Sequence, residues 1–68
     1  MRNFTPGQRV KVLKENWRNY PNWQDVIGGA FVVDHATILN DMPGFMCWPE
    51  SPYTAGLYFL MDEHLIRA

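Results

Sequence analysis

The stretch VIGGAFVVDHATIL, residues Val26–Leu39, contains the densest run of β-branched and aromatic side chains in the chain. Such side chains suit a pleated, half-buried surface, so the stretch predicts a long central strand. The pair Gly28–Gly29 lies where such a strand would have to bulge or bend sharply, as strands of a small barrel do. We expect the pair Asp34–His35 to mark a kink that divides the stretch into two strands near Ala36.

Shorter strands are predicted on both sides of the central stretch. Arg9–Leu13 alternates charged and apolar side chains, which is the period of a strand with one face in water. We expect Val10 and Val12 to point inward, and Arg9 and Lys11 to point outward. Two later strands are expected at Phe45–Trp48 and Gly56–Met61, of which the second is apolar on both faces.

Turn-forming residues separate these strands. Asn40–Gly44 is the clearest loop, and Pro49–Pro52 is a second one because its two prolines cannot belong to a central strand. Near the end of the chain, Asp62 can cap a short turn, after which Leu65 and Ile66 fold back onto the sheet. The chain is therefore predicted to be all-β: a single domain, residues 1–68, forming a small barrel of about five short antiparallel strands with a C-terminal one-turn helix.

The segment Lys14–Asp25 breaks every periodicity, and two interpretations of it compete. A helical turn across Glu15–Tyr20 would place Trp17 and Tyr20 on one face. Alternatively, the segment is a long open loop, and Pro21 would end any helix at Tyr20. We favour the loop.

Length, charge and cysteine content limit the function classes. A chain of 68 residues buries only ~60% of its unfolded surface, so packing or association with another chain has to supply stability. Cys47 is the single cysteine, which excludes an internal disulfide and fits a reducing cytoplasm. Six basic against seven acidic residues argue against a nucleic-acid binder, and no apolar run is long enough to span a membrane.

Two segments carry a resemblance to a known superfold. Phe4-x-x-Gly7-Gln8-Arg9-Val10-x-Val12 resembles the opening strand of SH3-like small barrels, and Tyr58-Phe59-Leu60-x-x-Glu63-His64-Leu65 resembles their closing strand and one-turn helix. The resemblance covers most of the chain and implies an SH3-like barrel. Barrels of this class serve many functions, so the resemblance by itself assigns none.

One enzyme family with this barrel, the plasmid-borne type II dihydrofolate reductases, binds folate and NADPH in a tetrameric pore. Its members carry a Val-Gln-Ile-Tyr motif on the strand before their final leucine. Alignment on Leu65 places Leu57-Tyr58-Phe59-Leu60 there, so both the glutamine and the tyrosine are replaced. That activity is not carried over to this chain.

Side chains that could perform catalysis or bind a metal are few. Neighbours along a strand point to opposite faces, so neither Asp34-His35 nor Glu63-His64 is expected to form a catalytic dyad. A metal site would need both histidines and an acid such as Asp62 to converge. Cys47, between two large apolar residues, is expected to be a buried, inert thiol. No catalytic residue, metal or cofactor is predicted.

The aromatic side chains carry the strongest functional signal. Phe31, Phe45 and Phe59 are expected in the core. The remaining large rings exceed what so small an interior can hold, and they include the candidate partner-binding residues Trp17, Tyr20, Trp23, Trp48 and Tyr53. Exposed Trp and Tyr side chains are typical interface anchors. Alternatively, these rings fold over the ends of the barrel and seal a thin core.

The sequence therefore favours a non-enzymatic protein-binding module whose partner is a peptide, another protein or a second copy of the chain. Its size and near-neutral charge fit a small accessory factor of the kind carried by phages and plasmids. A second hypothesis is nucleic-acid binding through the basic residues Arg2, Arg9, Lys11, Lys14 and Arg18, beside stackable aromatic rings. A third, a small oligomeric enzyme, would need a polar constellation that the sequence lacks.

Overall fold

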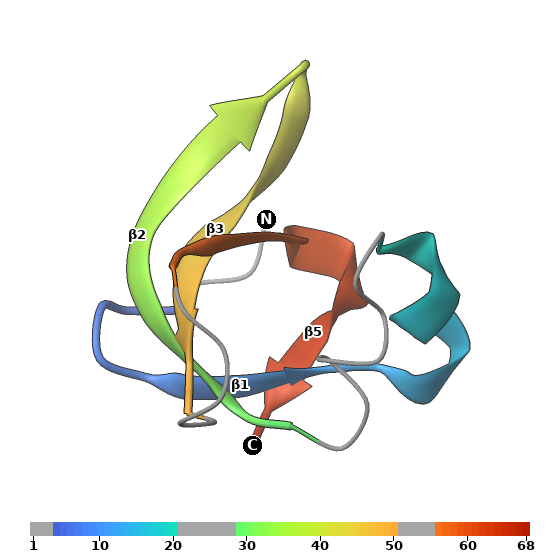
Figure 1. Cartoon of the computed structure of the whole chain (residues 1–68). Coiled ribbons are helices and arrows are strands. Elements are labelled where there is room, and N and C mark those ends of the chain that lie inside the picture. The colour runs from blue at the N-terminus through green and yellow to red at the C-terminus, as the bar shows by residue number, and fades with distance from the viewer. Residues whose placement is uncertain (1–3, 21–28, 51–55) are drawn as a thin grey trace.

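A computed structural model of the chain describes residues 4–20, 29–50 and 56–68 (Figure 1). Its strands are β1 (Arg9–Val12), β2 (Phe31–Leu39), β3 (Met42–Pro49), β4 (Tyr58–Met61) and β5 (Leu65–Arg67). Two 3-10 helices, η1 (Lys14–Asn19) and η2 (Asp62–His64), follow β1 and β4. The strands form one antiparallel sheet in the order β4-β3-β2-β1-β5, which confirms the all-β prediction. Within the described residues, no helix has the length and apolar character needed to cross a membrane.

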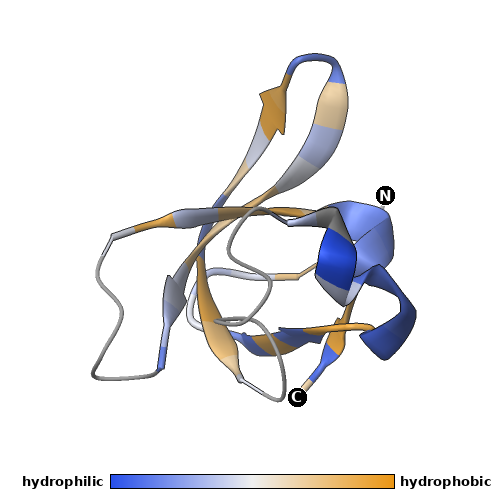
Figure 2. Ribbon diagram, turned by 45° about the vertical axis from the view of Figure 1, so that its right-hand side comes forward, coloured by the Kyte–Doolittle hydropathy of each residue, from blue (hydrophilic) through white to orange (hydrophobic). Residues whose placement is uncertain are grey.

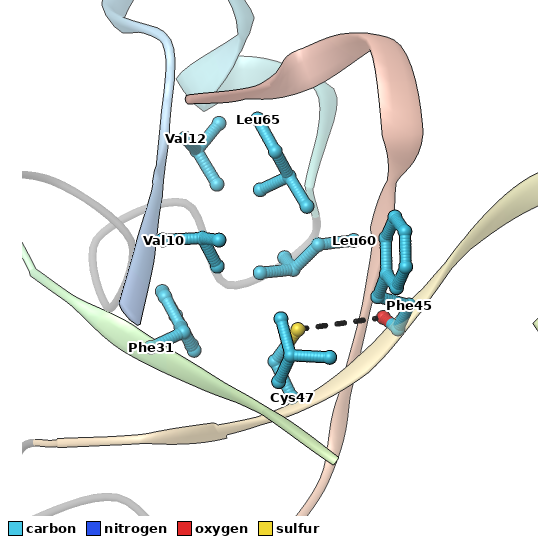
Figure 3. Close-up of a cluster of buried hydrophobic side chains, with 8 residues drawn as sticks. Val10, Val12, Phe31, Phe45, Cys47, Leu60 and Leu65 are labelled. Atoms are coloured by element: carbon cyan, nitrogen blue, oxygen red, sulfur yellow. Dashed lines mark hydrogen bonds between the residues drawn. The ribbon is translucent and has the colours of Figure 1, made fainter. Parts of the chain in front are cut away.

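All five strands contribute side chains to one hydrophobic core (Figure 3). The core residues are Val10, Val12, Phe31, Val33, Phe45, Cys47, Leu60 and Leu65. A single sheet can surround one core with side chains from every strand only if it curls, and Figure 1 shows this curvature. The predicted alternation in β1 is confirmed, because its two valines are buried and its two cations are exposed.

Phe59 is the exception among the predicted core aromatics. Phe31 and Phe45 are fully buried, but strand alternation turns Leu60 inward and Phe59 outward, where it is half-buried. Tyr58 takes the inward place instead, with its ring centroid 5.5 Å from that of Phe31. The prediction was wrong because a strand that is apolar on both faces does not reveal its inward face.

The central strand bends but does not divide. The β2–β3 pairing shifts register between Val33 and His35, so the expected kink is present as a β-bulge. Pairing then continues to Leu39, opposite Met42, and the predicted division near Ala36 is therefore wrong. Of the pair Gly28–Gly29, where a bend within the strand was expected, Gly28 lies outside the described residues and Gly29 precedes β2, which begins at Phe31.

The β2–β3 hairpin turns tightly at Asn40 and Asp41, whose φ angles are 51° and 65°. Two consecutive positive φ angles are typical of a type I′ turn, which matches the twist of the flanking strands. The predicted loop Asn40–Gly44 is therefore too long, since Met42 already begins β3. Pro43 is tolerated because β3 pairs there with β2 alone, and pairing with β4 begins only at Gly44.

Of two short connections, one differs from the sequence prediction and the other agrees with it. Over Lys14–Asn19 the favoured open loop is wrong, because these residues form η1 and the indole N–H of Trp17 donates a 3.0 Å hydrogen bond to the carbonyl of Val12. The predicted turn after β4 is confirmed as η2. The chain then forms β5, which pairs with β1 through Leu65 opposite Val12.

Candidate protein-binding surface

Tyr20 joins the end of η1 to the turn that follows β4. Its hydroxyl accepts a hydrogen bond from the backbone N–H of Met61 at 3.1 Å and shares a second one, of 2.8 Å, with Nδ1 of His64. The tautomer of the imidazole decides which group donates in the bond to His64, because the hydroxyl oxygen can both donate and accept. Burial raises the pKa of Tyr20, and the hydrogen bond from Met61 opposes this effect.

The three predicted partner-binding aromatics that the structure describes lie on two different parts of the fold. Trp17 and Tyr20 are half-buried and pack against the hydrophobic core from η1. Trp48 lies on β3, with 47% of its surface exposed. Trp23 and Tyr53 lie outside the described residues.

An apolar surface covers the side of β3 and β4 that faces away from the core. Burial of Phe45, Cys47 and Leu60 fixes the inward side of these strands, so the residues between them face outward. We define the outer apolar face by Leu39 of β2, Met42, Met46 and Trp48 of β3, and Phe59 and Met61 of β4. The face of an antiparallel sheet that is turned toward water is usually polar, so this composition is unusual.

Cross-strand pairs make the outer apolar face continuous. Leu39 pairs with Met42, and Met46 pairs with Phe59. Between these pairs lies Gly44, where an added Cβ would come within 2.7 Å of the Phe59 ring. The phenyl ring therefore covers the glycine and closes the gap in the face. Leu39, like Trp48, is 47% exposed, and the end of β2 at the hairpin tip is coloured hydrophobic in Figure 2.

Asp34 holds the side chain of Trp48, which lies at one end of the outer apolar face. Its carboxylate accepts a 3.1 Å hydrogen bond from the indole N–H of Trp48 and a 2.6 Å hydrogen bond from Nδ1 of His35. The bond from His35, followed by that from Trp48, holds the pKa of Asp34 below its usual value. The sequence argument against an Asp34–His35 contact was wrong, because the bulge interrupts the alternation of side chains in β2. The carboxylate thus orients an exposed tryptophan.

A histidine that is oriented by a carboxylate, as His35 is by Asp34, can act as a general base that activates a nucleophile such as a thiol. The single cysteine of the chain does not serve as that nucleophile. Cys47 is fully buried, and burial raises its pKa to about 12, so the thiol stays protonated, as the sequence predicted for an inert cysteine. His64 is engaged with Tyr20 on another part of the sheet. Among residues 4–20, 29–50 and 56–68, no three potential metal ligands cluster.

The structure describes four of the five candidate nucleic-acid residues. Arg9 forms a two-point ion pair with Glu50, with contacts of 2.8 and 3.0 Å, which raises the pKa of Arg9 and lowers that of Glu50. Lys11 and Lys14 are exposed beside Trp17. Arg18 is exposed on η1, and Arg2 lies outside the described residues.

Comparison with known proteins does not assign a function, so the proposal below depends on the chemistry of the surface. No protein-family model, curated protein or solved structure matches the chain. Sequence reasoning selected Trp48 but missed the methionines beside it. The signal was present in part, since Met46 and Trp48 alternate with the buried Phe45 and Cys47 along β3, and Met42 and Gly44 continue the same two-residue spacing.

Proposed function

We propose that this chain is a non-enzymatic protein-binding module and that the outer apolar face is its contact surface. The observation that carries the proposal is the alternating row of Met42, Met46 and Trp48 on β3, beside Phe59 and Met61 on β4. Aromatic residues and methionine are enriched at protein interfaces, and contiguous exposed apolar patches are uncommon on proteins without partners.

The proposal includes an SH3-like barrel as the scaffold. It is supported by the strand order β4-β3-β2-β1-β5, by the long segment between β1 and β2, and by the single 3-10 turn between β4 and β5. It also agrees with the resemblance of the first and last strands. The buried, unpaired thiol of Cys47 supports a cytoplasmic location.

The surface combines a fixed anchor with adaptable neighbours. The hydrogen bond to Asp34 restrains the Trp48 ring before binding, which lowers the entropy lost when a partner orders it. Methionine side chains are flexible and polarisable, so Met42, Met46 and Met61 can adapt to the shape of a partner. The partner is another protein, a peptide segment of one, or a second copy of this chain.

The experiment is a selection of displayed random peptides on the intact chain, with light scattering on the same sample to detect self-association. We expect the chain either to select peptides rich in apolar residues or to associate with itself. Leu39→Ser and Trp48→Ser should abolish either interaction. A monomer that selects no peptide would contradict the proposal.

Ile38→Ser is the matched control for Leu39→Ser. Ile38 is the neighbouring residue in β2 and is more exposed, at 69%, but it pairs with Pro43 and so lies on the opposite side of the hairpin. If the outer apolar face is the contact surface, Ile38→Ser should leave binding unchanged. Equal losses in the two variants would place the interaction elsewhere on the hairpin.

A further inference from the structure

A groove separate from the outer apolar face lies between η1 and the strands β1 and β5. It has a volume of about 340 Å³. Its apolar lining is formed by Val12, Leu13, Trp17 and Ile66, and its charged lining by Lys11, Lys14 and Glu15. It shares no residue with the surface assigned to the proposed function.

The sheet and η1 build the two sides of this groove. Lys11 pairs with Ile66 on the outward side of β1 and β5, because the next pair along, Val12 and Leu65, points into the core. η1 then turns the chain back, and the hydrogen bond from the Trp17 indole to the Val12 carbonyl fixes the aromatic wall.

The charge of the groove is opposite to that of the chain. The whole sequence has a net charge of -1, but the groove presents two lysines against one glutamate. Both lysines are exposed, and neither forms an ion pair with another residue in the described parts of the chain. Two exposed ammonium groups beside an apolar groove favour a ligand that carries negative charges around one apolar side chain.

We propose that this groove binds an acidic peptide segment, with one apolar side chain inserted beside Trp17 and carboxylates on Lys11 and Lys14. The volume is at the lower end of the ~300–1,000 Å³ typical of ligand clefts, which is enough for one or two side chains. Exposed ion pairs are individually weak and are screened by salt, so the complex is weak and salt-sensitive.

The same features disfavour a nucleic acid in this groove. Affinity for nucleic acids comes mainly from neutralised phosphates, and two lysines neutralise few of them. Trp17 is half-buried and packs against the hydrophobic core, which reduces the ring area that is open to a stacking base.

The test is an NMR titration of the isotope-labelled full chain with a pool of short acidic peptides, each with one central apolar residue. We expect shifts at Lys11, Val12, Ile66 and the Trp17 indole. A pool with Asn and Gln in place of the acids should produce none. Absent shifts, equal shifts from both pools, or shifts confined to the outer apolar face would overturn the proposal. Shifts at the groove with oligothymidylate but not with the peptides would assign it to nucleic acid.

Charge-reversal variants separate local from global electrostatics. Lys14→Glu should weaken binding of the acidic pool by about tenfold, the sum of a lost attraction and a new repulsion. Arg67→Glu changes the net charge equally, but Arg67 is absent from the groove lining and should leave binding nearly unchanged. Equal weakening by both variants would overturn a local role for Lys14. The Leu39→Ser variant should bind the acidic pool normally, because Leu39 is absent from the groove lining. The proposal for the groove and the proposal for the outer apolar face are therefore tested independently.

Discussion

The hydroxyl of Tyr20 lies 2.8 Å from Nδ1 of His64, across 44 positions of sequence. The same hydroxyl accepts the backbone N–H of Met61, at the edge strand β4 of the sheet. Free N–H groups on an edge strand are templates for unwanted pairing with another chain. Tyr20 therefore connects η1 to the end of the sheet and occupies one of those edge groups.

Tyr20→Phe should lower the free energy of unfolding by about 1–3 kcal/mol, because a half-buried N–H and a histidine nitrogen lose their partner. Denaturant unfolding measures the change. Trp48→Phe is the control: it also removes one hydrogen bond, but to the exposed Asp34, and should change stability by no more than about 0.5 kcal/mol. Equal effects of the two substitutions would show that the Tyr20 contacts contribute nothing particular to the fold.

Gly44→Ala should destabilise the chain by about 2–3 kcal/mol through overpacking between β3 and β4. The new Cβ would lie 2.5 Å from the backbone oxygen of Leu60, so a strand rather than a flexible side chain would have to move. Thermal unfolding provides the measurement. Gly56→Ala meets no atom within 4 Å and should cost only about 1–2 kcal/mol from its positive φ. A smaller loss at Gly44 than at Gly56 would contradict the close packing described here.

Stability should fall in alkaline solution because of Cys47. Burial raises the folded-state pKa of this thiol from 9.0 to about 12, so above pH 9 the unfolded chain releases a proton that the folded chain retains. The contribution of the protonated thiol to the free energy of unfolding is complete below pH 9. It is then lost at up to about 1.4 kcal/mol per pH unit as the pH rises toward 12. The raised pKa of Tyr20 acts in the same direction.

Urea unfolding of wild type and Cys47→Ala at several alkaline pH values tests this prediction. The variant should be less stable at neutral pH, because it loses a buried sulfur, but its stability should decline less steeply above pH 9. Identical slopes would mean that the thiol ionises equally easily in the folded and unfolded states.

Elements dominated by local pattern were predictable from the sequence. The inward valines of β1 and the one-turn helix after β4 depend on alternation and turn chemistry within a few residues. The pairing of β5 with β1 brings Leu65 against Val12, and η1 is held by the packing of Trp17 against the core. These contacts depend on residues distant in sequence or on the finished core, which no local period reveals.

The outer apolar face was only partly predictable. Trp48 was selected as a surplus aromatic, but Met42 was assigned to a loop because Pro43 and Gly44 follow it. Here an edge position accommodates the proline and the Phe59 ring covers the glycine, so both residues lie within a strand. The turn-forming residues therefore led to the wrong assignment of Met42, which belongs to β3.

Methyl NMR of the methionines tests the outer apolar face most directly. Met42, Met46 and Met61 make up half of that face, and of the four methionines in the chain only Met1 is outside it and outside the described residues. With isotope-labelled methyl groups, addition of a selected peptide, or an increase in protein concentration if the chain self-associates, should shift all three signals together, and Leu39→Ser should prevent the shift. Binding or association that leaves these three signals unchanged would contradict the account.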